Sequence, residues 1–342
     1  MKTVLVRGAH VVTVDDQDTV ERVDLRIEDG VIAMMGPGLS ERGVDVVVRA
    51  EGLVAVPGFV QAHIHLCQTL FRCQADDMEL LGWLQNRIWP MEAALTAGDL
   101  RAGARLGLAE LLLGGTTAIL DMGTVHHSDV LFEEAARLGM RYTGGKTIMD
   151  SGQGFPPALK ETPGAAIAES VRLCERWHGR ENGRLRYAFA PRFVLSCSEG
   201  VLRACVTEAR ARGAVLHTHA AENPEEVQLV RSRFGEGNIE YLHRLGFTGR
   251  DVLLAHGVWL SAQEQRILRE TRTCIVHCPS SNLKLASGIA RVEELLAADI
   301  PLALGADGAP CNNTLDGFME MRLAALLHKV RGGPAAVPAA TA

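Results

Sequence analysis

Histidine and carboxylate residues recur in this sequence at spacings that suit a divalent metal ion. His63 and His65 form a His-x-His pair, and His219, His256 and Asp307 follow further along the chain. In extended backbone, residues i and i+2 point the same way, so His63 and His65 can both present a ring nitrogen to one ion. Imidazole and carboxylate ligands suit zinc or iron better than calcium or magnesium. Such an ion lowers the pKa of a bound water toward about 7, which supplies a nucleophile at neutral pH.

This interpretation depends on the strands that are expected to carry these residues. From Pro57 onward, apolar strand-like runs alternate with helical stretches, which is typical of βα units and a parallel sheet. Eight strands are expected: Gly58–His63, Thr116–Asp121, Arg141–Met149, Leu185–Ala190, Val215–His219, Val252–His256, Thr273–His277 and Leu302–Asp307. The predicted fold is therefore an α/β (β/α)8 TIM barrel, with Leu315–Val330 as the helix after the last strand.

Polar residues gather where these predicted strands end. The first strand ends at His63, the fifth at His219, the sixth at His256, the seventh at His277 and the eighth at Asp307. In such barrels the carboxyl ends of the strands form the active-site face. Each signal alone is weak, because a histidine at a strand end is often structural and an aspartate after a strand is often a helix cap. Their occurrence in order on several strands predicts one catalytic metal site.

Two further segments flank the predicted barrel, which is expected to span residues 57–330. Residues 1–56 consist of short β-segments separated by Gly, Asp and Pro, and Asp29-Gly30 is a hairpin signal. We expect a small separate β-structure there. Residues 331–342 are small and proline-rich, which predicts a disordered tail.

The composition narrows the classes of partner. The net charge is −6 without a basic stripe, so nucleic acid is not an expected partner. No apolar run approaches the roughly 20 residues of a membrane span, and the N-terminus alternates like a strand rather than a signal peptide. The eight cysteines are scattered without a C-x2-C motif, as expected of reduced thiols. The sequence therefore predicts a cytoplasmic protein with no membrane or nucleic-acid partner.

Longer motifs resemble the amidohydrolase superfamily, in its branch of aromatic deaminases and s-triazine hydrolases. The matching segments are PGFVQAHIHLCQTL (57–70), HTHAAE (217–222), LLAHGVWL (253–260), VHCPSSNLKL (276–285) and LGADGAPCNNTLDGFMEMRLA (304–324), and the resemblance covers residues 1 to about 330. It implies one divalent ion, Zn²⁺ before Fe²⁺, with His63, His65, His219 and Asp307 as ligands. It also implies that the N-terminal segment is half of a small β-sandwich.

The resemblance implies further roles around that metal. Glu222, three positions after His219, would be the proton shuttle. His256 would hydrogen-bond the attacking water or the developing intermediate, and Asp307 would take a proton from that water. Substrate contacts are expected of Gln68, Trp83, Glu92, Arg192 and His277.

The expected reaction is hydrolytic deamination of an amino-substituted aromatic nitrogen heterocycle, with release of ammonia. This places the chain among hydrolases that act on C–N bonds in cyclic amidines. Trp83 and Glu92 resemble adenosine-type deaminases, in which the glutamate contacts ribose hydroxyls. Arg192 instead resembles guanine deaminases, in which the arginine faces a carbonyl oxygen of the base, because a guanidinium is a donor only. The structural alternative for Arg192 is an ion pair with a neighbouring carboxylate, and for the tryptophan it is core packing.

Other functions stay open at this point. The same site could displace chloride or an amine from a triazine, or the chain could be a catalytically impaired, truncated amidohydrolase that acts as an interaction protein. A dihydropyrimidinase-like hydrolase is less expected, because the fourth strand, LRYAFAPRF (185–193), offers no lysine to bridge two metals. Members of the branch usually continue well beyond the helix after strand eight, so we expect the C-terminal half of the sandwich to be missing. They are also commonly oligomeric, which makes a homo-oligomer a further expectation.

Overall fold

The computed structural model describes residues 2–342. The chain divides into two compact units, Met1–Gly58 and Phe59–Ala342. Every helix among residues 2–342 is too short or too polar to serve as a membrane span.

The first unit is a five-stranded sheet built from runs of β-branched residues. Its strands are β1 (Val4–Val12), β2 (Val20–Glu28), β3 (Val31–Gly36), β4 (Val46–Arg49) and β5 (Val54–Ala55). Their order is β3-β2-β1-β4, and β5 also pairs with β1. Asp29 and Gly30 adopt positive φ angles of 50° and 79° in the β2–β3 turn, as the hairpin signal predicts.

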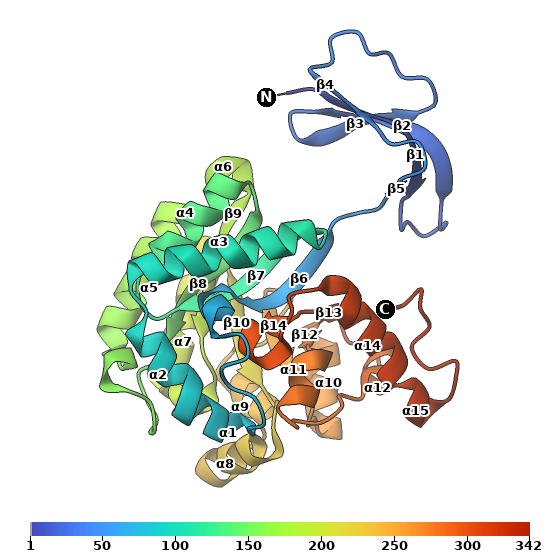
Figure 1. Ribbon diagram of the computed structural model, residues 1–342. Coiled ribbons are helices and arrows are strands. Elements are labelled where there is room, and N and C mark those ends of the chain that lie inside the picture. Colours follow the sequence, from blue (N-terminus) through green and yellow to red (C-terminus); the bar gives the residue numbers. More distant parts are fainter. Residues whose placement is uncertain (1) are drawn as a thin grey trace. The chain divides into compact units, whose positions relative to one another are not determined.

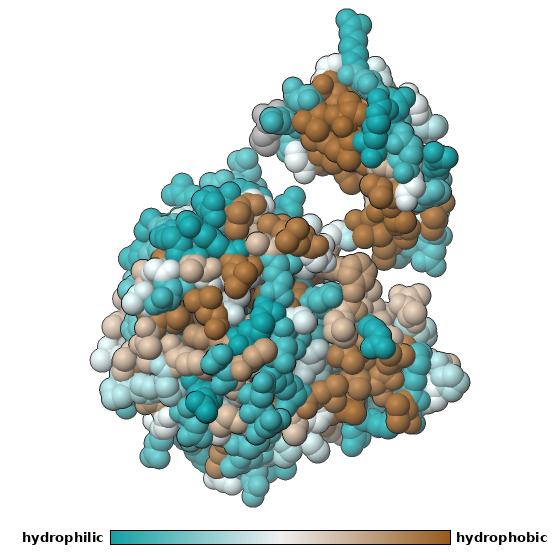
Figure 2. Space-filling view, in the orientation of Figure 1, coloured by the Kyte–Doolittle hydropathy of each residue, from teal (hydrophilic) through white to brown (hydrophobic). Residues whose placement is uncertain are grey.

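Many apolar side chains of this small unit are exposed. Val31, Ile32, Met34 and Val54 are each more than half exposed, and its core is limited to a few residues around Val11 and Leu25. The apolar surface of this unit is visible in Figure 2. The predicted sandwich half stays a prediction.

The second unit contains a curled parallel sheet of nine strands (Figure 1). The strands are β6 (Phe59–His65), β7 (Thr116–Thr124), β8 (Arg141–Ile148), β9 (Leu185–Pro191), β10 (Val215–Ala220), β11 (Val252–His256), β12 (Cys274–His277), β13 (Leu302–Leu304) and β14 (Asp307–Gly308). Their order is β13-β12-β11-β10-β9-β8-β7-β6-β14. The predicted parallel α/β architecture is confirmed.

Helices cover the outside of this sheet (Figure 1). The α-helices are α1 (Leu80–Trp83), α2 (Trp89–Ala94), α3 (Ala97–Leu113), α4 (Asp129–Leu138), α5 (Pro163–Trp177), α6 (Arg180–Gly183), α7 (Glu199–Arg212), α8 (Pro224–Phe234), α9 (Asn238–Arg244), α10 (Ala262–Thr271), α11 (Pro279–Lys284), α12 (Val292–Ala297), α13 (Ala309–Asn312), α14 (Gly317–Leu327) and α15 (Lys329–Gly332). Shorter or wider turns are η1 (Leu66–Phe71), η2 (Leu84–Ile88), η3 (Pro157–Leu159) and η4 (Val194–Ser196).

Capping residues mark the starts of two of these helices. Thr96 and Asp99 form a capping box at the start of α3, and Ser261 and Glu264 form another at the start of α10. The main core lies between helices and sheet, where the Phe132 ring of α4 lies 4.9 Å from the ring of Tyr142 in β8. This packing fixes the strands whose carboxyl ends carry the candidate site.

Two sequence expectations about element boundaries are corrected. The predicted helix Leu315–Val330 is two helices, α14 and α15. The predicted strand Leu302–Asp307 is interrupted at residues 305–306, so β13 pairs with β12 and β14 pairs with β6. The disorder predicted for residues 331–342 stays a prediction; within that segment the Val337 side chain packs against Val258, Ala290 and Val292.

The interruption at Gly305 brings the two ends of the curled sheet together. A Cβ at Gly305 would lie 2.7 Å from the carbonyl oxygen of His63 and 2.8 Å from its backbone nitrogen. Only a residue without a side chain therefore permits this approach to β6.

We predict that Gly305→Ala lowers the free energy of unfolding by about 1–3 kcal/mol, because the added methyl group forces β6 and the β13–β14 segment apart. Urea denaturation of both proteins measures the change. Gly164→Ala is the matched control, since a Cβ at that residue of α5 meets nothing within 4 Å. Equal midpoints for Gly305→Ala and the parent chain would contradict the close approach.

Candidate metal centre

The four predicted ligands converge at the carboxyl ends of their strands. His63 and His65 lie at the end of β6, His219 lies in β10 and Asp307 begins β14. One possible ligand atom from each lies within 4.8 Å of those of the other three. The pairing of Asp307 with Ile64 places the carboxylate beside the His-x-His segment.

The distances within this cluster match the edges of a tetrahedral site. Asp307 Oδ1 lies 3.3 Å from His63 Nε2 and 3.4 Å from His65 Nε2, and His65 Nε2 lies 3.1 Å from His219 Nε2. A zinc ion with ligands at about 2.0–2.1 Å in tetrahedral geometry separates neighbouring ligand atoms by about 3.3–3.4 Å. His63 Nε2 is also buried without a hydrogen-bond partner among the described residues. The donor set therefore fits a divalent metal ion.

Burial fixes the charges of these groups. Burial lowers the pKa of His63, and it holds the pKa values of His65 and His219 well below their usual range. Burial would raise the pKa of Asp307, but the neighbouring His63 and His65 rings hold that pKa well below its usual value. The site thus combines an ionised carboxylate with imidazoles whose burial disfavours their charged form, and both tendencies suit metal binding.

Glu222 and His256 lie beside the cluster. Glu222 Oε2 is 3.3 Å from His256 Nε2, and His256 Nε2 is 3.9 Å from Asp307 Oδ2. Burial, together with the charge of Asp307, raises the pKa of Glu222 well above its usual value. Two nearby carboxyl groups therefore have pKa values shifted in opposite directions, an arrangement that separates an acid from a base.

Several side chains that sequence reasoning did not assign support the cluster. Asp121 Oδ1 accepts a hydrogen bond from the backbone N–H of Leu66 at 2.9 Å, directly after His65, and burial raises the pKa of Asp121 to about 6. Ser281 Oγ donates to Asp307 Oδ2 at 2.7 Å. Asp121 ends a predicted strand, so the pattern from which the ligands were predicted was present there too.

Two residues at the site have positive φ angles, which residues other than glycine rarely adopt. His256 has a φ of 77° and Asp307 a φ of 62°. Such angles persist only where the surroundings determine them, and they concentrate at functional sites.

Arg192, Glu92 and Gln68 form one buried polar group. Arg192 Nη1 lies 2.6 Å from Glu92 Oε2, and Arg192 Nη2 donates to Glu92 Oε1 at 3.2 Å. Gln68 Nε2 donates to the same Oε1 at 2.8 Å. Arg192 is therefore ion-paired with Glu92, which is the alternative to a substrate carbonyl contact considered in the sequence analysis. Arg192 and Gln68 line one cavity with Trp83, His65, Glu222 and Asp307.

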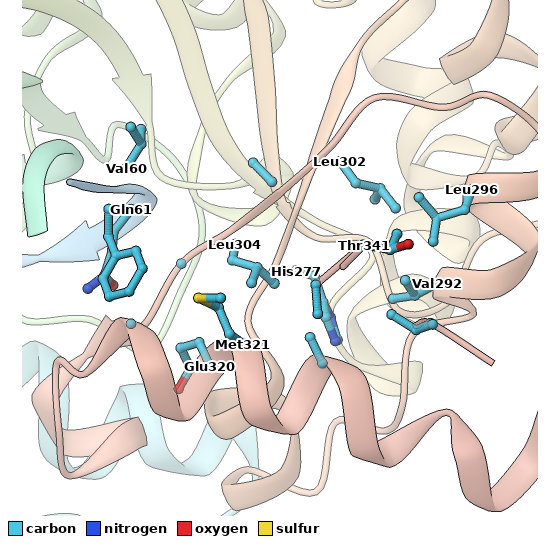
Figure 3. A pocket seen from close by; sticks show the side chains of 17 residues that line it. Val60, Gln61, His277, Val292, Leu296, Leu302, Leu304, Glu320, Met321 and Thr341 are labelled. Carbon is cyan, nitrogen blue, oxygen red and sulfur yellow. The ribbon is translucent and has the colours of Figure 1, made fainter. Parts of the chain in front are cut away.

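His277 lies apart from this centre. Its buried ring lines a separate cavity of about 270 Å³ together with Val292, Leu302 and Thr341 (Figure 3). The ring centroid is 5.7 Å from that of His328. On β12, His277 shares a side with Ile275, which packs in the core between sheet and helices. The structure therefore does not bring His277 to the other expected substrate contacts.

Comparisons with known proteins show related sequences and a related structure. A model of the amidohydrolase family matches residues 54–341. The chain is 37% identical to a 5′-deoxyadenosine deaminase of Methanosarcina acetivorans, over 99% of this chain and 77% of that protein. It is 38% identical to a 5-methylthioadenosine/S-adenosylhomocysteine deaminase of Haloarcula marismortui, over 100% and 77%. The solved structure of a zinc-bound adenosine deaminase from Xanthomonas campestris is 31% identical, with a TM-score of 0.90 over 99% of this chain and 76% of that one.

We predict that Glu92→Ala lowers the free energy of unfolding by about 3–5 kcal/mol, because it leaves the buried Arg192 guanidinium unpaired. Chemical denaturation measures the loss. Glu199→Ala is the control, because the Arg203–Glu199 pair is almost half exposed and its removal should cost no more than about 1 kcal/mol. Equal losses of unfolding free energy in both variants would show that the buried Arg192–Glu92 pair stabilises the fold no more than the exposed pair.

Proposed function

The chain belongs to the amidohydrolase family, and on that basis we propose that it is a metal-dependent hydrolytic deaminase of a purine-type heterocycle that releases ammonia. The observation that carries the proposal is the His63, His65, His219 and Asp307 cluster with Glu222 beside it. The relatives that are 37–38% identical over nearly the whole chain carry the names of adenosine-type deaminases. An adenosine-type nucleoside is therefore the proposed substrate class.

We assign the four cluster residues as ligands of one divalent ion, zinc before iron. When bound, the ion lowers the pKa of a coordinated water and so supplies a nucleophile. A second group, His65, Cys67 and Glu92, also brings ligand atoms within 4.8 Å of one another. Both oxygens of Glu92 already accept hydrogen bonds from Arg192 or Gln68, which supports a single ion.

Glu222 is the proposed proton shuttle. His256 Nδ1 donates to Asn282 Oδ1 at 2.9 Å, and its Nε2 lies 3.3 Å from Glu222 Oε2. A protonated Glu222 agrees with the raised pKa of this buried side chain. Glu222 can then give a proton to a ring nitrogen of the heterocycle and later pass a proton to the leaving amine. Asp307, ionised beside the histidines, accepts one proton of the attacking water. The other water proton passes through the emptied Glu222 carboxylate to the amine, which leaves as ammonia, and the proton on Asp307 then restores Glu222.

The substrate contacts follow from buried polar atoms without partners. Gln68 Oε1 and Trp83 Nε1, both in cavity-lining side chains, have no hydrogen-bond partner among the described residues. They offer one acceptor and one donor to a heterocycle edge. Arg192 is held by Glu92, so its presence alone does not favour an oxo-purine over an adenosine-type substrate.

The cavity must enlarge to admit such a substrate. Its volume is about 20 Å³, which is enough for about one water molecule. Leu80, Trp83 and Leu84, from the segment after η1, line it. Movement of that segment is the expected route of entry.

We also propose that the curled sheet is an eight-stranded barrel, in which β13 and β14 are two parts of one strand. The supporting observation is that these consecutive segments pair with opposite ends of the sheet. The small N-terminal sheet, with its exposed apolar residues, would be half of a β-sandwich.

We predict that Glu222→Gln retains the metal and lowers turnover by about 10²–10⁴-fold, because an amide cannot shuttle a proton. Ammonia release measures turnover, and elemental analysis measures metal content. Glu225→Gln is the matched control, since Glu225 is an exposed residue of the first turn of α8. Near-parental turnover by Glu222→Gln would exclude this role for Glu222.

Substrate class is tested by ammonia release from adenosine, 5′-modified adenosines, guanine, 8-oxoguanine, cytosine and ammeline. The proposal expects the largest kcat/KM among the adenosines. Preference for guanine or 8-oxoguanine would assign Arg192 to a substrate carbonyl instead. No release from any of them by the zinc-loaded chain would contradict the deaminase proposal.

A further inference from the structure

His217 is a buried histidine of the candidate site to which no role has been assigned. It precedes His219 by two residues on β10, so both side chains point to the same side of the strand. Its ring lies across from β6, where His217 Nε2 is 2.8 Å from His63 Nδ1. Its other nitrogen, Nδ1, is 2.9 Å from the carbonyl oxygen of Leu253 in β11. We propose that His217 is a positioning residue that fixes the tautomer of His63, which deepens the proposed metal role of that ligand.

Donor and acceptor accounting gives the direction of this chain of hydrogen bonds. A carbonyl oxygen only accepts, so His217 Nδ1 must carry the hydrogen that it shares with Leu253. A neutral imidazole carries one N–H, so His217 Nε2 is then an acceptor. His63 Nδ1 must therefore be the donor in the 2.8 Å contact. The only lone pair left on the His63 ring is on Nε2, the atom that faces Asp307 Oδ1 at 3.3 Å.

The other ligand histidines are oriented differently. His219 Nδ1 lies 2.7 Å from the carbonyl oxygen of Arg192, so the backbone itself sets its tautomer. His65 Nδ1 has no hydrogen-bond partner among the described residues. Among the three proposed histidine ligands, His63 is thus the one whose tautomer depends on a side chain. A substitution of that side chain can therefore change the tautomer of His63.

The burial of His63 and His217 explains why a side chain must fix the tautomer of His63. The side chains of His63 and His217 are both fully buried, and neither residue lines the cavity that contains Trp83 and Glu222. Water in that cavity therefore cannot accept a hydrogen bond from His63 Nδ1. Without His217, the His63 proton can move to Nε2, where it would block the lone pair that binds metal.

Two amide substitutions separate the two hydrogen bonds of His217, one to His63 and one to Leu253. The amide oxygen of Gln lies three bonds beyond Cβ, as Nε2 of histidine does, so His217→Gln can still accept from His63. The amide group of Asn lies two bonds beyond Cβ, as Nδ1 does, so His217→Asn can still donate to Leu253 but cannot reach His63. Both residues are neutral and polar, which makes each the control for the other.

The experiment measures Zn²⁺ affinity by competition with a chromophoric chelator, together with thermal unfolding of the metal-free proteins. We expect His217→Asn to lose about 10–100-fold in affinity, the usual cost of removing such a partner, and His217→Gln to stay within about threefold of the parent chain. Equal losses in both variants, or no loss in either, would overturn the proposal.

A second measurement does not depend on either His217 variant folding. ¹⁵N-edited spectra of the histidine rings in the metal-free parent chain, with His63 identified through His63→Gln, report which nitrogen carries the proton. Protonation at Nδ1 of His63 is expected, and protonation at Nε2 would overturn the proposal even if zinc binds. If the parent chain holds no zinc, the proposed metal site fails separately, while this tautomer measurement still decides the role of His217.

Discussion

The need to bury three histidines beside one carboxylate constrains the rest of this structure. His219 donates from Nδ1 to a carbonyl oxygen, so its Nε2 lone pair faces His65 Nε2 at 3.1 Å, a spacing that suits two ligand atoms of one cation. Asp307 supplies negative charge at 3.3 Å and 3.4 Å from two of these nitrogens. Buried polar groups are costly unless they are matched, and a divalent ion held by these four residues, as proposed, would match them.

The surrounding elements serve that constraint. The break at Gly305 lets β14 start beside β6, and Asp307, whose φ is 62°, places its Oδ1 3.3 Å from His63 Nε2. Arg192 connects two parts of the site, because its carbonyl oxygen accepts from His219 Nδ1 while its guanidinium pairs with Glu92. A change at Glu92 can therefore reach His219, a proposed metal ligand, through one residue.

Much of this arrangement could be predicted from the sequence, because strand ends and residue spacing are local signals. The alternation of strands and helices and the convergence of His63, His65, His219 and Asp307 required only the rule that parallel strands end on one face. The direction of His277 could not be predicted, since it depends on which side of β12 faces the helices. The Arg192–Glu92 pair joins residues 100 positions apart, and sequence alone offered it only as an alternative. The break in the last strand follows from a close approach that no periodicity reports.

Anomalous diffraction from zinc-soaked crystals tests the central claim most directly. The account predicts a single peak about 2.0–2.2 Å from the Nε2 atoms of His63, His65 and His219 and from an oxygen of Asp307. A zinc-saturated crystal without that peak, or with its zinc held elsewhere on the chain, would contradict the claim that this cluster is a catalytic metal centre.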